Sequence, residues 1–339
     1  MFQNEEQLEN ALSEPSPEVI EALGDLEGTF LVLGAAGKMG LSMARMVKRA
    51  AEATGGSRRV IAVSRFSTIN DEAAFHSHGI ETIRCDLLDE SRTDQLPFAE
   101  NVIAMLGMKF GSTGNESMTW AMNAWLPSVI CRRYRSSRIV AFSTGNVYSL
   151  TPIAAGGSRE SDALMPVGEY AMSAVGRERM YEYFSLRDNI PMALIRLNYA
   201  CDLRYGVLVD LARKVFNTEP IDLSMGYFNT IWQGDANAWA LQSFAHLASP
   251  PWVVNVTGPE TLSVREVATQ MAQRMNRPLQ FTGSEAETAL LSNTDLAQQR
   301  FAPLRISTAA LIDGVADWVS SGGRFLGKPT HFESRDGKF

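Results

Sequence analysis

The stretch Thr29-Phe-Leu-Val-Leu33-Gly34-Ala-Ala-Gly37-Lys-Met-Gly40 decides the fold of this chain. Its first five residues form a short apolar run, which predicts a buried strand. The three glycines then predict a tight turn, and Leu41 to Arg49 predicts a helix directly after it. At the start of such a helix, free backbone N–H groups can bind the pyrophosphate of a dinucleotide. The alternative interpretation is a glycine turn without a ligand.

The residues after this unit continue the alternation of strands and helices. Val60 to Val63 supplies the next strand at the spacing expected of a βαβ unit. We therefore expect an α/β fold, a doubly wound parallel sheet of the Rossmann type with a smaller C-terminal α/β lobe for the substrate. Further strands are predicted at 82–84, 102–106, 139–143 and 192–197, and helices at 118–134 and 168–187.

The chain divides into three predicted parts. A short helical extension precedes the first strand, and the substrate-binding lobe is inserted in and follows the dinucleotide-binding domain. The predicted bounds are 1–27 for the extension, 28–198 plus 228–258 for the dinucleotide-binding domain, and 199–227 plus 259–339 for the lobe.

Composition and charge indicate a soluble cytoplasmic protein. The 339 residues are 45% hydrophobic and 20% charged, and the net charge of -7 argues against binding to nucleic acid or anionic membranes. Three widely spaced cysteines favour a reducing compartment. No stretch has the length of a membrane helix. His76 and His78 fit the polar end of a helix better than a metal site, so no metal is expected.

The end of the second predicted strand bears on the choice of coenzyme. An NAD site usually places a carboxylate there for the ribose, whereas an arginine can bind the 2′-phosphate of NADP. This chain has Ser64 and Arg65, and no carboxylate before Asp71. Lys38, beside Met39 in the glycine turn, adds a second cation. The sequence thus favours NADP, with NAD possible; alternatively, both cations are solvated surface residues.

A second informative stretch is Tyr170-Ala-Met-Ser-Ala174. A tyrosine followed by serine and then lysine on one helix face is a redox signature, because the nearby cation lowers the pKa of the phenol. In this chain the position of the lysine holds Ala174. The proton-transfer group is present, but the usual cation is missing or has moved.

Taken together, these motifs resemble the extended short-chain dehydrogenase/reductases of the NAD-dependent epimerase/dehydratase family. The resemblance covers nearly the whole chain. It is carried by Gly34, Gly37 and Gly40, Asp86-Leu87, Asn123, Phe142-Ser-Thr-Gly-Asn-Val-Tyr148, Tyr170, Ile195-Arg-Leu-Asn-Tyr199 and Asn255-Val-Thr-Gly-Pro-Glu260, in family order.

This resemblance implies roles for individual residues. Tyr170 would be the general acid/base, and Thr144 would donate a hydrogen bond to the same substrate oxygen. Asp86 and Leu87 would contact adenine, and the loop with Leu106 and Gly107 would lie near the nicotinamide. The resemblance also implies a homodimer, in which the helices at 118–134 and 168–187 pair; alternatively, their apolar residues only face the sheet.

Ala174 leaves three accounts open. Another cation can replace the lysine, either Lys109 after the fourth strand or Arg177 two turns beyond Tyr170. The coenzyme charge and the helix dipole alone can activate Tyr170. Or the chain has lost catalysis and kept coenzyme binding, as a sensor or scaffold.

The substrate lobe indicates a small substrate. Nucleotide-sugar members of the family usually carry an arginine before the region of Phe228, and Met225-Gly-Tyr-Phe228 has none. We therefore expect an NADP-dependent oxidoreductase acting on a hydroxyl or carbonyl of a sugar, sugar acid, lactone or polyol. An epimerase or dehydratase with transient redox of the coenzyme is the alternative. Polar candidates for the substrate, each with an equally good structural role, are Arg196, Asn198, Arg204 and Gln233.

Overall fold

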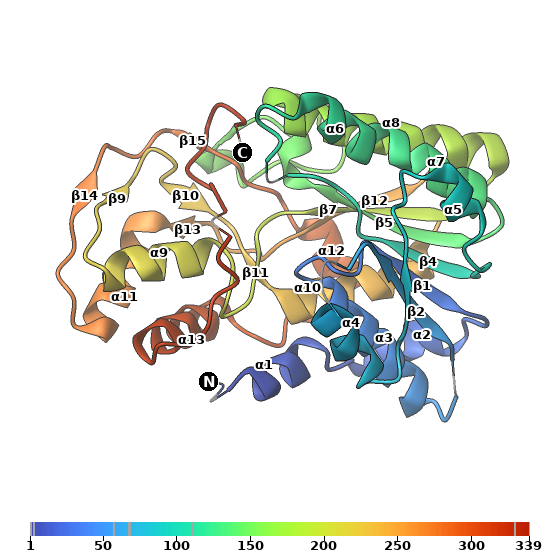
Figure 1. Cartoon of the computed structure of the whole chain (residues 1–339). Coiled ribbons are helices and arrows are strands. Elements are labelled where there is room, and N and C mark those ends of the chain that lie inside the picture. Colours follow the sequence, from blue (N-terminus) through green and yellow to red (C-terminus); the bar gives the residue numbers. More distant parts are fainter. Residues whose placement is uncertain are drawn as a thin grey trace.

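A seven-stranded parallel sheet forms the centre of the molecule (Figure 1). The structure, a computed structural model, describes residues 2, 4–56, 58–66, 69–109, 111–328 and 330–338, without the side chains of Ile69 and Asn70. The strands lie in the order β12-β7-β5-β4-β1-β2-β3, so β2 and β3 lie on one side of β1, and β4 and the later strands lie on the other. Their bounds are β1 Phe30–Leu33, β2 Val60–Ser64, β3 Glu81–Arg84, β4 Asn101–Ala104, β5 Arg138–Thr144, β7 Met192–Leu197 and β12 Trp252–Val256.

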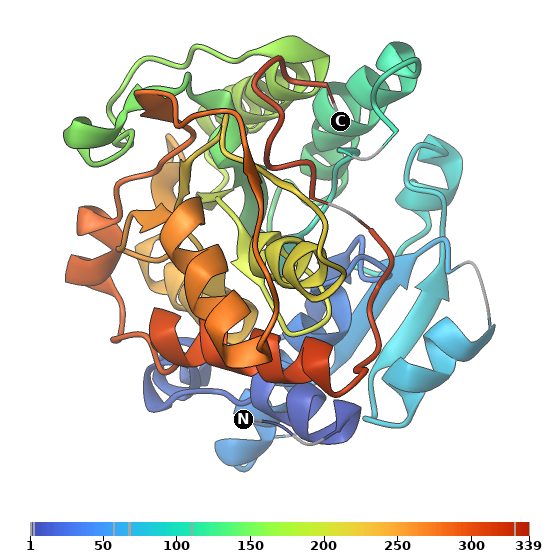
Figure 2. The ribbon, with the colours of Figure 1, turned by 90° about the vertical axis from the view of Figure 1, so that its left-hand side faces the viewer.

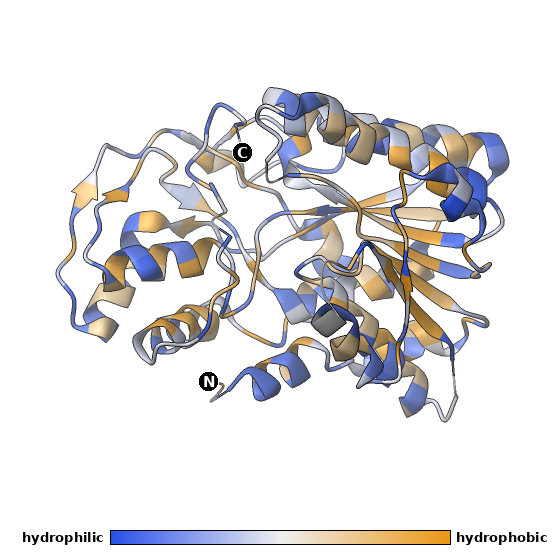
Figure 3. Ribbon diagram, in the orientation of Figure 1, coloured by the Kyte–Doolittle hydropathy of each residue, from blue (hydrophilic) through white to orange (hydrophobic). Residues whose placement is uncertain are grey.

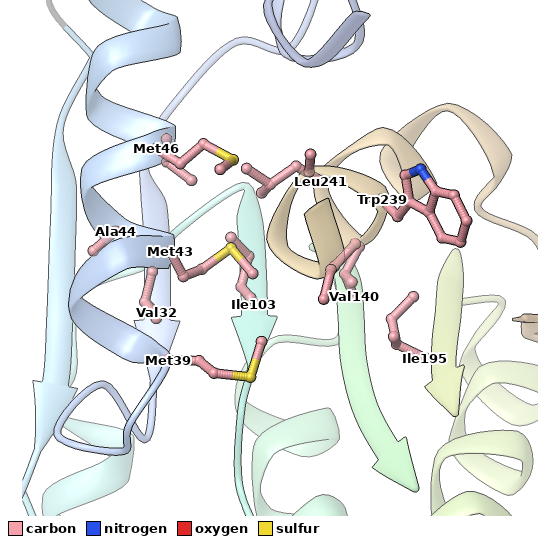
Figure 4. Packing of buried hydrophobic residues seen from close by; sticks show 14 of the residues in the cluster. Val32, Met39, Met43, Ala44, Met46, Ile103, Val140, Ile195, Trp239 and Leu241 are labelled. Atoms are coloured by element: carbon pink, nitrogen blue, oxygen red, sulfur yellow. The ribbon is translucent and has the colours of Figure 1, made fainter. Parts of the chain in front are cut away.

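Helices cover both faces of this sheet, because alternate residues of each strand point to opposite sides. Phe30 and Val32 of β1 pack against one layer, and Leu31 and Leu33 pack against the other. Figure 4 shows the first layer, in which methionines of α3 and Trp239 of α10 meet the strands. This layer consists of α2 (Pro17–Gly24), α3 (Gly40–Ala53) and α10 (Gln233–Gln242), and the other includes α7 (Leu126–Arg133) and α8 (Gly168–Asp188).

A second buried cluster belongs to a lobe that lies beyond the carboxyl ends of the strands and faces the viewer in Figure 2. Its three helices bury their apolar faces against one another and expose their polar faces, as the alternating colours of Figure 3 show. Short strands complete this lobe. Its helices are α9 (Val207–Phe216), α11 (Val264–Met275) and α13 (Thr308–Ser320), and its strands are β9 (Ile221–Asp222), β10 (Tyr227–Phe228), β13 (Leu262–Ser263) and β14 (Phe281–Thr282).

The remaining elements connect or flank these two parts. α1 begins at the N-cap Asn4 and buries Leu8 and Leu12 in the second cluster, whereas α2 buries Val19 and Leu23 against the sheet layer. The predicted helical extension thus consists of two helices that contact different cores. The other bounds are α1 Glu5–Leu12, α4 Ile69–His76, α5 Glu90–Asp94, α6 Glu116–Trp120, α12 Asp295–Arg300, β6 Thr151–Pro152, β8 Ala200–Cys201, β11 Ile231–Trp232 and β15 Thr288–Ala289.

The parallel sheet and its helices confirm the predicted Rossmann-type fold class. One predicted helix differs: 118–134 is α6, a π-helical turn over Ala121–Trp125, and then α7. Pro127 explains the irregularity, since it has no N–H for the carbonyl of Asn123 and its ring would clash with that carbonyl in a regular helix. The irregular turn places Asn123 where its amide bonds the loop after β4.

Candidate active site

A hollow of about 220 Å³ lies above the glycine turn between β1 and α3. Gly34 has a φ of +79°, and a Cβ atom there would lie 2.6 Å from the carbonyl oxygen of Met105. A Cβ atom at Gly40 would lie 2.0 Å from the carbonyl oxygen of Ala35. Only glycine therefore allows this close packing of turn, helix and neighbouring strand. The hollow is also lined by Gly37, Lys38, Met39, Leu106 and Gly107.

The glycine turn beside this hollow has the features of a phosphate-binding site. The backbone turn is open to the hollow, and α3 begins at its edge without a side-chain cap on its first N–H groups. Such groups bind the phosphates of a dinucleotide, and the glycines let the backbone approach them. The glycine turn, Leu106 and Gly107 are thus brought together as the sequence predicts.

Arg177 of α8 reaches the same hollow from beneath the loop after β4. Its side chain is almost fully buried, donates from Nη1 to the carbonyl of Phe142 at 3.1 Å, and donates from Nη2 to Asn123. A Cβ atom at Gly107 would lie 2.3 Å from Nη2, so the glycine makes room for the guanidinium. The buried Nε has no hydrogen-bond partner among the described residues. A ligand in the hollow would meet a fixed positive charge there.

Ala174, three residues before Arg177 on α8, has apolar surroundings. It is fully buried and packs against Val147 and Tyr148, in a small apolar cluster beneath the loop after β5. Ser173, one residue earlier, accepts a hydrogen bond from Asn123 at 2.8 Å. The helix turn with Ser173 and Ala174 is therefore held by apolar packing and a hydrogen bond. Neither of these two residues supplies the cation that a lysine would bring in the family signature.

A second hollow of about 190 Å³ adjoins the first at the carboxyl ends of β5 and β7. Lys38, Lys109, Ser143, Tyr170 and Leu197 border both hollows. Thr144 lines the second one, where its hydroxyl donates to Asn146 at 3.1 Å. Asn198 lines it as well. Tyr170, Thr144, Lys109 and Asn198, predicted from separate motifs, therefore share one cleft.

Two lysines project into this cleft from different loops. The Nζ atom of Lys38 donates to the carbonyl of Ala200 at 3.0 Å and lies 3.7 Å from the ring centroid of Tyr205. The Nζ atom of Lys109 lies 6.0 Å from the ring centroids of both Tyr170 and Tyr199. Burial lowers the pKa of Lys38 to about 8. Burial and the charge of Lys38 lower the pKa of Lys109 to about 7.

A buried ion pair supports the floor of the cleft. Arg196 of β7 and Glu178 of α8 lie 2.8 Å apart, and Ser143 donates to the same carboxylate at 2.5 Å. Arg196 also donates to the hydroxyl of Tyr148 at 2.6 Å. Because its donors are used within this network, Arg196 serves to hold β5, β7 and α8 together.

Several predicted site residues lie outside both hollows. Arg65 is exposed after β2, and Ser64 accepts a backbone bond from Cys85. Asp86 caps its own turn by accepting from the N–H of Leu88 at 3.2 Å, next to the buried Leu87. Four predicted residues lie at or just after the carboxyl ends of β2 and β3, namely Ser64, Arg65, Asp86 and Leu87. The glycine turn follows the carboxyl end of β1 at the same edge of the sheet.

The two remaining substrate candidates have structural partners. Arg204 forms ion pairs with Asp202 and with Glu9 of α1, each at 2.7 Å. Gln233 donates to Ser42 of α3 at 3.1 Å. Neither of them lines the hollow that holds Tyr170.

The cleft also contains residues that the sequence analysis does not assign to the site. Tyr199 and Tyr205 border it from the segment after β7, and Thr330 borders it from the C-terminal segment. Tyr199 has a φ of +48°, a conformation rare for a non-glycine residue. Asn146 belongs to the motif Phe142–Tyr148, so the sequence places it close to Thr144. Thr330 lies far along the chain in no motif, so the sequence alone does not predict its place at the cleft.

No helix in the described part of the chain is long and apolar enough to cross a membrane. Within the same residues, no group of three or more His, Cys, Asp or Glu side chains is placed to hold a metal ion.

Comparisons with known proteins give matches in structure but not in sequence. No family model and no curated protein sequence matches the chain. UDP-glucuronic acid 4-epimerase from Bacillus cereus, solved with NAD, has a TM-score of 0.70 at 14% identity, over 86% of this chain and 96% of that one. The dTDP-glucose 4,6-dehydratase from Streptomyces venezuelae, solved with NAD, has a TM-score of 0.71 at 15% identity, over 86% and 97%.

A third neighbour is UDP-glucose 4-epimerase from Thermotoga maritima, solved with UDP-glucose, with a TM-score of 0.68 at 13% identity, over 87% and 99% of the two chains. At these identities the likeness shows a shared fold. The chain therefore has the fold of NAD-dependent sugar-nucleotide epimerases and dehydratases over most of its length.

Proposed function

We propose that this protein is a nicotinamide-dependent oxidoreductase that acts on a hydroxyl or carbonyl group of a small, sugar-like substrate. The observation that carries the proposal is the position of Tyr170 and Lys109, which border both the hollow above the glycine turn and the adjoining second hollow. A group held in the second hollow would thus face both the phenol and the coenzyme.

The coenzyme would occupy the hollow above the glycine turn. Gly34, Gly37 and Gly40 would admit its pyrophosphate, the start of α3 would stabilise the phosphate charge, and Leu106 and Gly107 would border its nicotinamide end. When bound, a nicotinamide coenzyme supplies the redox chemistry, the exchange of a hydride with a substrate carbon. Two of the three structural neighbours were solved with NAD. Arg65, in place of a carboxylate after β2, supports NADP, and Ser64, Asp86 and Leu87 would border the adenosine.

The side chains of this protein would move the proton. The Tyr170 phenol would give a proton to, or take one from, the substrate oxygen, and the Thr144 hydroxyl would turn from Asn146 to donate to that oxygen. Lys109, whose Nζ atom lies 6.0 Å from the ring centroid of Tyr170, would place an amine beside the reacting phenol. Arg177 would supply the charge that the family's lysine places on the coenzyme side.

A small substrate fits the size of the second hollow. Its volume of about 190 Å³ is below the range of roughly 300–1,000 Å³ typical of sites for drug-sized ligands. The C-terminal segment limits it, because Thr330 borders the hollow and bonds to Asp210 of α9 at 2.7 Å. Asn198 would contact the substrate from the end of β7. A second candidate function is that of an epimerase or dehydratase on a nucleotide-linked sugar. It is supported by the structural neighbours, which are 4-epimerases and a 4,6-dehydratase of such sugars.

The assembly and the location are part of the proposal. Two copies would pair through α6, α7 and α8, where Trp125, Met172 and Leu186 are between 45% and 58% exposed. The three cysteines are free and buried, which supports a cytoplasmic location.

The proposal is tested by nicotinamide absorbance with purified protein and a panel of sugars, sugar acids, lactones and polyols, with both coenzymes. We expect a change with at least one compound, and a loss of about 100-fold or more in rate for Tyr170→Phe, because general acid/base catalysis contributes about 10²–10⁴-fold. Coenzyme affinity should change little. Undiminished turnover by Tyr170→Phe would refute the role of the phenol. Bound coenzyme without any absorbance change would favour the internally recycling epimerase or dehydratase.

A further inference from the structure

The second hollow is positively charged although the chain as a whole is acidic. Lys38 and Lys109 both border it, and among the described residues that line it none is Asp or Glu. The net charge of the chain is -7, so this local excess of positive charge opposes the overall balance. Burying two amines at one site is unfavourable unless a negative charge compensates them.

Lys38 points toward the substrate side of the cleft. Its backbone belongs to the glycine turn, but its Nζ atom reaches the carbonyl of Ala200 in β8 and the ring of Tyr205. Both partners belong to the segment after β7, across the cleft from the start of α3. A carbonyl and an aromatic face use only part of the capacity of an ammonium group, which has three donors. The charge is thus presented to the substrate.

The carboxylates nearest to the two lysines are bound elsewhere. Asp210 of α9 attracts both lysines, but its Oδ2 accepts bonds from the N–H and the hydroxyl of Thr330 at 2.8 and 2.7 Å. Asp202 attracts Lys38 and pairs with Arg204. Both carboxylates already have partners, so neither replaces an anion in the hollow.

The hollow combines this charge with hydroxyl and amide groups suited to a polyol. We propose that the substrate is anionic, a small polyhydroxylated compound whose carboxylate or phosphate group lies between Lys38 and Lys109 while Tyr170 acts on a hydroxyl or carbonyl carbon. The inference rests on the proposed function, since it names the substrate class of the same cleft. The groups that would bind the hydroxyls are Thr144, Asn146, Asn198, Tyr199, Tyr205 and Thr330.

The lowered pKa values support this arrangement. In the free protein the amine of Lys109, with a pKa of about 7, is only partly protonated at neutral pH, and that of Lys38, at about 8, is mostly protonated. An anion favours the protonated amines and raises both pKa values, so its binding takes up protons. Affinity should therefore be highest below pH 7 and fall as the pH rises through 7 and 8. The other titratable groups that face the lysines are Tyr170, Tyr199, Cys201, Asp202, Tyr205 and Asp210.

Calorimetric titrations of the protein loaded with NADPH or NADH, whichever binds more tightly, test the inference by substrate affinity. The probes are D-glucuronate, D-glucose 6-phosphate and D-glucose, which share a pyranose ring and differ in the charged group. We expect one anion to bind at least about tenfold more tightly than D-glucose, and that advantage to fall at pH 9. The tighter of the two anions identifies carboxylate or phosphate as the recognised group. Binding of neither anion in preference to D-glucose would overturn the inference.

Variants of single lysines test whether Lys38 and Lys109 cause the preference for the anion. Lys38→Met and Lys109→Met should each reduce the preference for the anion about tenfold, whereas Lys48→Met, which removes the same charge from the outer side of α3, should leave it unchanged. Equal preference in all three variants would contradict the inference. If the wild type binds the anion selectively but never changes nicotinamide absorbance, the inference stands and the redox function fails.

Discussion

Arg177 and Ala174 lie about one turn apart on α8 and have opposite surroundings. Ala174 packs in an apolar cluster, whereas the guanidinium of Arg177 borders the hollow above the glycine turn, beside Gly107. An arginine cannot give up its proton in a protein, so its charge persists at any working pH. Lys109, with a pKa near 7, has a charge that depends on pH and on the ligand. The positive charge of Arg177 is therefore constant, whereas that of Lys109 varies with pH.

The predicted preference for NADP over NAD depends on a single residue, Arg65. Its side chain is exposed after β2, where a 2′-phosphate would be bound. Arg65→Ala should weaken NADPH binding by about tenfold and leave NADH binding within about twofold, because only NADPH carries the extra phosphate. Fluorescence titrations with the two reduced coenzymes measure both affinities. Equal losses for NADPH and NADH would remove Arg65 from the 2′-phosphate.

At the scale of elements, a stripe of apolar residues lies on the outer face of α8. Met172, Tyr183 and Leu186 are spaced to share that face, and all three are at least 45% exposed. Trp125 exposes a similar fraction at the junction of the π-helical turn and α7. Figure 1 shows α6, α7 and α8 side by side on the outside of the sheet layer. A second copy would cover these side chains.

Met172→Glu tests this pairing, because it places a charge in the middle of the proposed contact. We expect sedimentation velocity to show a dimer for the wild type and a shift toward monomer for the variant. The control is Phe98→Glu, which places the same charge on an exposed aromatic residue before β4. A monomeric wild type, or a variant that dimerises like the wild type, would refute the pairing.

Most elements around the sheet could be predicted from sequence because their signals are local. The run of Thr29 to Arg49 contains strand, turn and helix within 21 residues, and the structure confirms them. The break in the helix at 118–134 was missed, although Pro127 was a local signal for it. The role of Ala174 as a packed residue depends on Val147 and Tyr148, which only the folded chain brings to it.

At the scale of the whole molecule, both ends of the chain tie the two parts together. Glu9 of α1 pairs with Arg204 of the second lobe, and Asn10 accepts a bond from Arg45 of α3 at 2.6 Å. The C-terminal segment passes the cleft at Thr330 and ends near Gly168, where a Cβ atom would lie 2.5 Å from the carbonyl oxygen of Gly337. These contacts join residues far apart in sequence, so no motif predicted Thr330 at the site.

The roles argued for Tyr170, Lys109 and Arg177 all depend on a nicotinamide coenzyme in the hollow above the glycine turn. The most direct test is therefore calorimetric titration of NADH and NADPH into the wild type, Gly40→Ala and Gly56→Ala, with thermal unfolding as a check on folding. A methyl group at Gly40 would collide with the carbonyl of Ala35, whereas one at Gly56 meets only an ordinary contact at 3.6 Å.

We expect at least one coenzyme to bind the wild type and Gly56→Ala alike, and to bind Gly40→Ala at least about tenfold more weakly. If Gly40→Ala does not fold, Arg177→Met takes its place, with a loss of similar size expected. A folded wild-type protein that binds neither NADH nor NADPH would contradict the central claim.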